Sequence, residues 1–114
     1  DLEAKVARAM AIEGARYIHV HVPCPLGWGS APSDTIKLAR LAVECGLFPL
    51  YEAHHGEVTA VTPIRRQVPV EDYLKPQKRF AHLFREPVDS EALTNIQETA
   101  ERNIRRFGLV EGAA

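Results

Sequence analysis

The chain has 114 residues, of which 46% are hydrophobic, and this suits one small globular domain with a modest core. Its 14 basic and 15 acidic residues nearly cancel, so no overall field favours nucleic acid or an anionic membrane as a partner. The two cysteines favour a reducing compartment, and with no membrane-spanning run and no leader in the sequence we expect a cytoplasmic protein.

A helix and a strand are the first elements predicted along the chain. Apolar residues recur at helical spacing over residues 2–13 and Gly14 follows, which predicts an amphipathic helix that covers one face of a sheet. Residues 17–22 alternate between β-branched side chains and Tyr17, His19 and His21, which predicts a strand. The chain opens inside the helix without an initiator methionine, so we expect a further segment upstream.

A stiff loop with one cysteine follows this strand. Prolines come after both Val22 and Cys24, and a residue before proline is pushed into the extended region, so the thiol is held on a rigid segment. Residues 26–29 include two glycines and all carry an N–H, so the loop can direct amides toward an electron-rich group. At the carboxyl end of a parallel strand, Cys24 would lie where open α/β sheets bind ligands. An inert, buried thiol in a turn is the alternative, and the spacing alone leaves both open.

A strand, helix and strand are predicted next. We expect Ser33 to cap a helix over residues 34–45 that ends at Gly46. Cys45 lies on the apolar face of this helix and is interpreted as a small core residue. Residues 48–53 are predicted to form a strand parallel to the first one, through a right-handed crossover.

The C-terminal half is predicted to hold a hairpin and two helices. The turn at residues 54–56 leads into a short strand over residues 57–62, and a short helix is expected over residues 70–75 among several prolines. Ser90 is expected to cap a helix that ends at Phe107. The result is a single partial α/β domain over residues 1–114, with an incomplete, mostly parallel sheet flanked by helices. We expect the first strand to pair outside this sequence or to leave an open edge beside exposed apolar helix faces.

Other candidate groups carry weaker signals. His19 and His21 share a strand face, but two imidazoles fall short of the three or four protein ligands of a zinc site, so polar packing is favoured. His54 and His55 are adjacent and would point apart, which is typical of a solvated turn. Residues 63–85 carry a local basic excess, interpreted either as a solvated face or as a docking surface for an acidic redox partner.

The cysteine loop and the residues after it resemble a known family. The resemblance is carried, in order, by PCPLGWG at 23–29, TI at 35–36, ARLAVE at 39–44, Gly46, FPLYE at 48–52, VEDYL at 70–74, Gln77, RF at 79–80 and HL at 82–83. This pattern looks like the C-terminal part of the thiamine-diphosphate-binding beta subunit of 2-oxoacid:ferredoxin oxidoreductases, the pyruvate:ferredoxin oxidoreductase family. The resemblance covers residues 14–86 and implies that the chain is the C-terminal segment of a thiamine-diphosphate-binding fold.

The resemblance also implies a cofactor role for the loop. Cys24 stands at the position of the fourth ligand of a 4Fe-4S cluster, whose other three cysteines lie upstream in the family, as does the motif that binds thiamine diphosphate and magnesium. The amides after Cys24, including that of Gly27, would donate hydrogen bonds to cluster sulphurs, and Trp28 would limit solvent access. None of the catalytic residues would lie in this chain, which alone is expected to bind neither thiamine diphosphate nor a stable cluster.

The implied function is the oxidative decarboxylation of a 2-oxoacid such as pyruvate, usually to an acyl-coenzyme A, with electrons passed through iron-sulphur clusters to ferredoxin. The implied partners are the rest of the beta subunit, the other oxidoreductase subunits and ferredoxin. Two alternatives stay open: a non-catalytic α/β interaction module without a redox centre, and a thiol enzyme that uses Cys24, for which no histidine is placed as a base.

Overall fold

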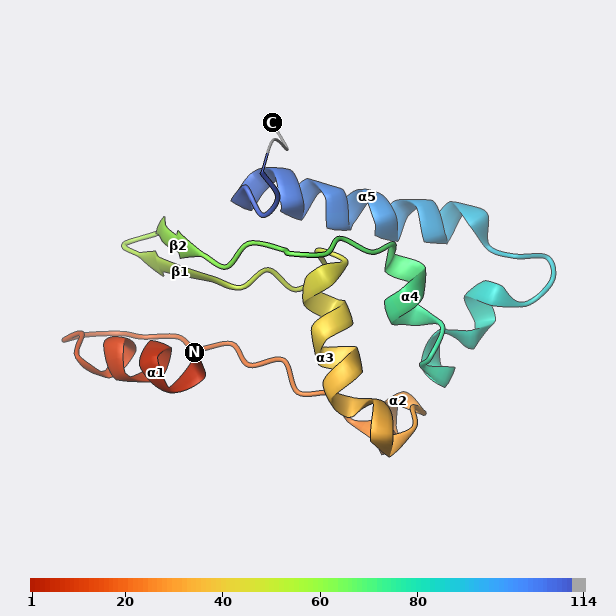
Figure 1. The fold of residues 1–114 in the computed structure, drawn as a ribbon, viewed down its shortest axis with the longest axis horizontal. Helices are drawn as coiled ribbons and strands as arrows, with labels where there is room; N and C mark the ends of the chain where they lie inside the picture. The colour runs from red at the N-terminus through yellow and green to blue at the C-terminus, as the bar shows by residue number, and fades with distance from the viewer. Residues whose placement is uncertain (112–114) are drawn as a thin grey trace.

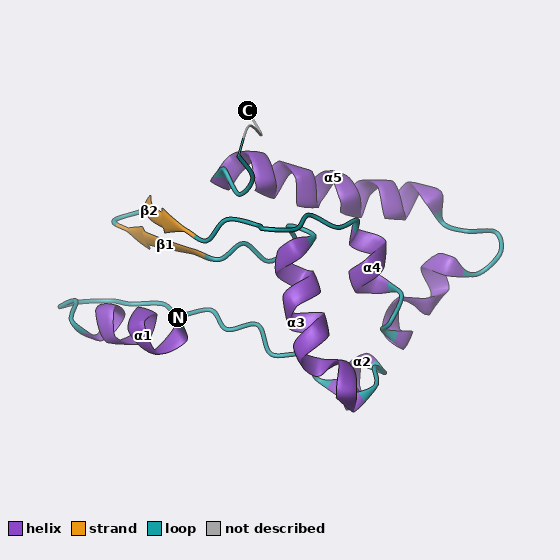
Figure 2. Ribbon diagram, in the orientation of Figure 1, coloured by secondary structure: helices purple, strands orange, loops and turns teal. Residues whose placement is uncertain are grey.

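Three helices pack together to form the body of the protein, and a hairpin and an N-terminal helix project from it (Figure 1). The computed structural model describes residues 1–111. Figure 2 shows that helices and loops make up most of these residues and that β-strands are confined to one hairpin. The elements in chain order are α1 (Leu2–Met10), α2 (Pro25–Trp28), the 3₁₀-helix η1 (Pro32–Asp34), α3 (Thr35–Glu44), β1 (Tyr51–His54), β2 (Glu57–Val61), α4 (Val70–Leu74), the 3₁₀-helix η2 (Lys78–Phe84) and α5 (Ser90–Phe107).

The core lies between helices and not on a sheet. Its buried side chains come from α3, α4, η2 and α5, and they are Leu38, Leu41, Ala42, Cys45, Val70, Tyr73, Leu74, Leu83 and Ala100. A smaller cluster of Ile64, Ile104 and Leu109 joins the end of α5 to the segment after the hairpin. The prediction that Cys45 is a core residue is confirmed, because its side chain is fully buried and burial raises the pKa of its thiol.

Gly46 allows α5 to cross closely over the C-terminal end of α3. Gly46 has a φ of +85°, and a Cβ at this position would lie 2.8 Å from Ile104 Cγ1 and 3.0 Å from the carbonyl oxygen of Ala100. The same carbonyl end of α3 accepts a hydrogen bond, because Asn103 Nδ2 donates to Gly46 O at 3.0 Å. The close approach therefore needs both the left-handed backbone and the missing side chain.

The predicted hairpin is confirmed, whereas the predicted parallel pair is wrong. β1 and β2 are antiparallel, with Tyr51 opposite Val61 and His54 opposite Glu57, and they form the one sheet within residues 1–111. Residues 17–22 are not a strand, and within residues 1–111 they make no backbone–backbone hydrogen bond. Alternation predicts an extended chain correctly, but a strand also requires a neighbour that pairs with its backbone groups.

Both predicted serine caps are wrong. Asp89 caps α5, because its Oδ1 accepts a hydrogen bond from the Ala92 N–H at 3.0 Å, and Ser90 is the first helical residue. Ser33 lies inside η1, and α3 begins after Asp34 without a side-chain cap. A cap is displaced by one residue at little energetic cost where two capping residue types are adjacent.

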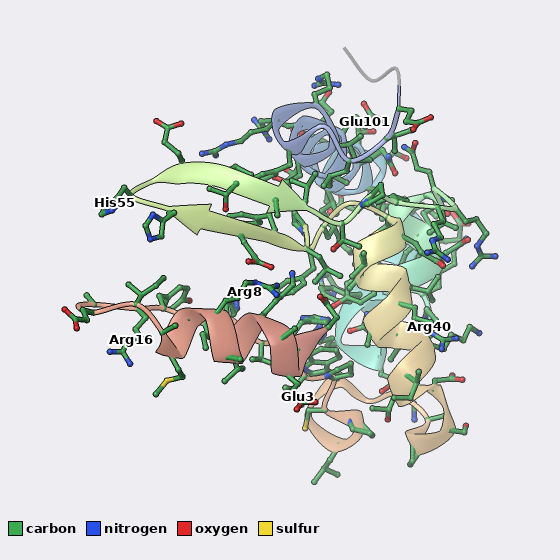
Figure 3. All side chains as sticks on the ribbon, turned by 60° about the vertical axis from the view of Figure 1, so that its left-hand side comes forward. Glu3, Arg8, Arg16, Arg40, His55 and Glu101 are labelled. Atoms are coloured by element: carbon green, nitrogen blue, oxygen red, sulfur yellow. The ribbon has the colours of Figure 1, made fainter. Side chains whose placement is uncertain are left out.

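The N-terminal helix α1 buries none of its residues. Its Arg8 lies on the side that faces the hairpin (Figure 3) and forms an ion pair with Glu52 of β1. The accessible surface of the chain is 8034 Å², whereas a compact monomer of this mass exposes about 6,200 Å². The radius of gyration is 15.9 Å, against about 13 Å for a compact chain of this length. The chain is therefore more extended than a compact domain of its size and leaves apolar side chains uncovered, which is consistent with the predicted incomplete α/β domain.

No helix within residues 1–111 combines the length and the apolar character that crossing a bilayer requires.

We predict that Gly46→Ala lowers the free energy of unfolding by about 2–4 kcal/mol, because the new Cβ adds backbone strain to a clash with Ile104 and Ala100. Chemical denaturation measures this change. The matched control is Gly56→Ala, where φ is +82° but no atom lies within 4 Å of the added Cβ, so only the strain of about 1 kcal/mol is expected. Equal losses for the two variants would show that α5 does not depend on close contact at Gly46.

Candidate functional site

The cysteine loop is a single helical turn that begins at Cys24. Cys24 is extended, with φ −113° and ψ 101°, and it caps the four-residue helix α2, whose first residue is Pro25. Its Sγ accepts a hydrogen bond from the Gly27 N–H at 3.4 Å, and its carbonyl accepts one from the Trp28 N–H at 2.9 Å. The extended backbone that the prolines predict at Cys24 is confirmed, while the helical turn after it was missed. A proline at the first helical position and a glycine after the last are the signal that could have found it.

The thiol of Cys24 is exposed and unpaired. The turn that carries it buries none of its residues, and Leu26 within it is 95% exposed. The alternative interpretation of a buried thiol at Cys24 is therefore wrong, and the role of the exposed thiol stays a prediction. In Figure 1, α2 lies beside the N-terminal end of α3, at the opposite end of that helix from the hairpin.

Two contacts attach the turn to the segment after α4. The guanidinium carbon of Arg79 lies 3.9 Å from the centroid of the Trp28 ring. The Lys78 N–H donates to the carbonyl of Gly29 at 3.2 Å. A Cβ on Gly29 would lie 2.7 Å from Lys78 Cβ, and Gly29 is in the left-handed region at φ +65°, so this approach also requires glycine.

His21 packs among aromatic rings behind the turn. Its ring centroid lies 4.8 Å from that of Phe48, 5.5 Å from that of Trp28 and 6.2 Å from that of Tyr73. Burial lowers the pKa of His21 below its ordinary value of 6.5, and the positive charge of Arg79 lowers it further. His21 is therefore neutral at pH 7 and packs among rings. The predicted polar packing is met only in part, because its buried Nε2 has no hydrogen-bond partner among the described residues.

The other histidines follow the prediction in part. The ring centroid of His19 lies 5.2 Å from that of Phe48, in an edge-on arrangement, and His54 and His55 lie exposed at the hairpin turn as predicted. The prediction that His54 and His55 point apart is wrong, because their ring centroids lie 4.4 Å from each other and His55 has a left-handed φ of +52° instead of an extended backbone. Residues 1–111 contain no group of three or more His, Cys, Asp or Glu side chains that could hold a metal ion. A metal centre that used any of these residues would therefore need further ligands from outside this set.

The turn could supply one cysteine ligand of an iron-sulphur cluster, and the other ligands would have to come from elsewhere. A cluster ligand must be an accessible thiolate, and amide N–H groups directed at the ligand sulphur tune such centres. Cys24 is accessible and Gly27 already directs its N–H at Sγ. The described residues contain one other cysteine, Cys45, which is fully buried on α3.

The charged groups of three of the six lysines and arginines over residues 63–85 make contacts within the chain. Arg66 forms an ion pair with Glu44 at 2.8 Å, Lys75 forms one with Glu71 at 2.8 Å, and Arg79 stacks on Trp28. These contacts favour the interpretation of the stretch as a solvated face of the protein, and the docking surface for an acidic redox partner stays a prediction.

Known proteins resemble this chain over nearly all of its length, although no family model matches it. They are subunits of 2-oxoacid oxidoreductases, and the chain belongs to their family. It is 46% identical over 109 residues to the pyruvate synthase subunit PorB of Methanosarcina barkeri, an alignment that covers 96% of this chain and 37% of that subunit. The same share of the chain is 41% identical to PorB of Methanocaldococcus jannaschii, of which it covers 35%.

A further relative has a different named substrate. The ketoisovalerate oxidoreductase subunit VorB of Pyrococcus abyssi is 35% identical over 91 residues, which cover 78% of this chain and 29% of that subunit. The resemblance predicted from the cysteine loop is therefore confirmed. The chain spans about a third of the length of these relatives, in their C-terminal part.

We predict that the melting temperature falls as the pH drops from 7.5 to 5.5. The pKa of His21 is lower in the folded chain than its ordinary value of 6.5, so the unfolded chain binds this proton first. Stability from this group is complete above pH 6.5 and is lost below it. Thermal unfolding over this pH range tests the effect, and His21→Phe, which keeps an aromatic ring but cannot titrate, should flatten the profile. An unchanged slope in His21→Phe would assign the pH dependence to other groups.

Proposed function

We propose that the chain is part of a 2-oxoacid:ferredoxin oxidoreductase and that its Cys24 is one ligand of a 4Fe-4S cluster. The observation that carries this proposal is an exposed thiol on a proline-fixed turn, in a sequence 46% identical to a pyruvate synthase subunit. The complete enzyme would oxidatively decarboxylate a 2-oxoacid such as pyruvate, usually to an acyl-coenzyme A. When bound, the cluster would supply one-electron transfer toward ferredoxin.

The residues of the turn would have separate tasks. Cys24 would hold one iron through its thiolate, and the Gly27 N–H, which lies 3.4 Å from Sγ, would donate a hydrogen bond that lowers the charge on the ligand sulphur. The indole of Trp28, on the same turn, would restrict water at the centre. Thiamine diphosphate and magnesium would be held elsewhere in the complete subunit, because the sequence contains no phosphate-binding motif.

The uncovered surface supports a place inside a larger assembly. Ile18 and Val20 are 42% and 49% exposed on the unpaired segment, and Val6 of α1 is 36% exposed. We infer that the rest of the beta subunit covers this face, so that the segment would join the thiamine-diphosphate-binding fold of the complete subunit. Other subunits and ferredoxin would complete the complex, and the two free thiols fit a reducing cytoplasm.

We predict that Cys24→Ala in the assembled oxidoreductase removes one cluster, with a loss of about four iron atoms per copy and a matching loss of ferredoxin reduction. The matched control is Cys45→Ala, which removes the other cysteine from the core and should lower stability by about 1–2 kcal/mol with full iron content. Iron and sulphide analysis, together with electron paramagnetic resonance, distinguishes these outcomes. Full cluster content in Cys24→Ala, with loss in Cys45→Ala, would reverse the assignment.

A further inference from the structure

Arg79 is held in one orientation by its own neighbours. Its Nε donates to Gln77 Oε1 at 2.8 Å, and its second guanidinium nitrogen lies 3.5 Å from the hydroxyl of Tyr73. Gln77 is a fully buried polar side chain whose amide nitrogen donates to the carbonyl of Tyr73. Tyr73 in turn belongs to the buried core. Arg79 is itself exposed, but two hydrogen bonds to buried side chains therefore orient its guanidinium.

The guanidinium carbon of Arg79 lies over two aromatic rings. It lies 3.9 Å from the Trp28 ring centroid and 4.6 Å from that of Phe80. An arginine can stack in this way because its charge is delocalised over a plane, whereas a lysine ammonium cannot present such a plane. The Trp28 ring therefore has a specific, oriented partner on η2.

Trp28 and Cys24 belong to one rigid unit. Trp28 is the last residue of α2 and donates its N–H to the carbonyl of Cys24 at 2.9 Å, while Gly27 donates to the thiol. The turn buries none of its own residues, so it cannot hold its position by a core of its own. The contacts with Arg79 and with the Lys78 N–H attach it to the body of the protein.

We propose that Arg79 is a positioning residue for the cluster ligand: it clamps Trp28 and thereby fixes the direction and the solvent cover of Cys24. This inference rests on the proposed function, in which Cys24 binds a cluster. Arg79 acts through Trp28 and is not itself a ligand. The charge of the side chain is not sufficient for this task, because the plane of the guanidinium makes the contact.

Trp28 is the sole tryptophan of the sequence, so its fluorescence reports on the clamp directly. In this chain, Arg79→Lys and Arg79→Gln should each raise the acrylamide quenching constant of Trp28 about two- to threefold, because both remove the stacked plane. Arg85→Gln, at an exposed arginine that ends the same 3₁₀-helix, is the matched control and should leave quenching unchanged. Unchanged quenching in both Arg79 variants would overturn the clamp.

A second measurement links the clamp to the cluster and separates the two proposals. In the assembled oxidoreductase, Arg79→Lys should start with full iron content but release iron to a chelator about tenfold faster than the unmodified protein, and Arg85→Gln should not. Release at the unmodified rate, in a complex whose Cys24→Ala variant lacks the cluster, would overturn the positioning role alone. A Cys24→Ala complex with full iron content would instead overturn the proposed function and this inference together.

Discussion

The missing side chain at Gly46 is the constraint on which the rest of the structure depends. It permits α5 to lie across the end of α3, with Ile104 and Ala100 in the space that a Cβ would occupy. α5 then closes the core over α4 and η2, whose buried Tyr73 and Gln77 orient Arg79. Arg79 and Lys78 hold the turn that carries Cys24. A glycine at the far end of α3 is thus connected, through one small core, to the position of the exposed thiol.

Features that depend on local sequence could be predicted. The apolar stripe of α5, the burial of Cys45 on α3 and the hairpin turn at His55 and Gly56 follow from neighbours within a few residues. Whether residues 17–22 have a partner strand could not be predicted in this way, and the predicted parallel sheet is wrong for this reason. Residues 17–22 have the alternation of a strand, but a strand exists only where another segment pairs with it, and the described residues supply none. The same absence explains why α1 has an amphipathic pattern and no buried residue.

In the candidate site, too, residues marked by local sequence could be predicted, whereas a residue defined by a distant contact could not. Cys24 could be singled out because the prolines on both sides of it restrict the backbone, whereas Gly27 and Trp28 were assigned from the family resemblance of the loop. Their part in cofactor binding stays a prediction. The role of Arg79 could not be predicted, because it depends on contact with the Trp28 ring, which lies 51 positions earlier in the chain. Sequence spacing contains no sign of that contact. The similarity to PorB and VorB subunits indicates the family, while the contacts indicate which side chains hold the turn in place.

In the proposed function, Cys24 is bonded to iron in the assembled oxidoreductase. X-ray diffraction from crystals of the complete complex, recorded above and below the iron absorption edge, tests this most directly because the anomalous difference locates iron atoms. We predict an anomalous peak in bonding contact with Cys24 Sγ, with three further thiolates from outside residues 1–111 around the same cluster. Iron clusters located elsewhere, with the Cys24 thiol free of metal, would contradict this proposal.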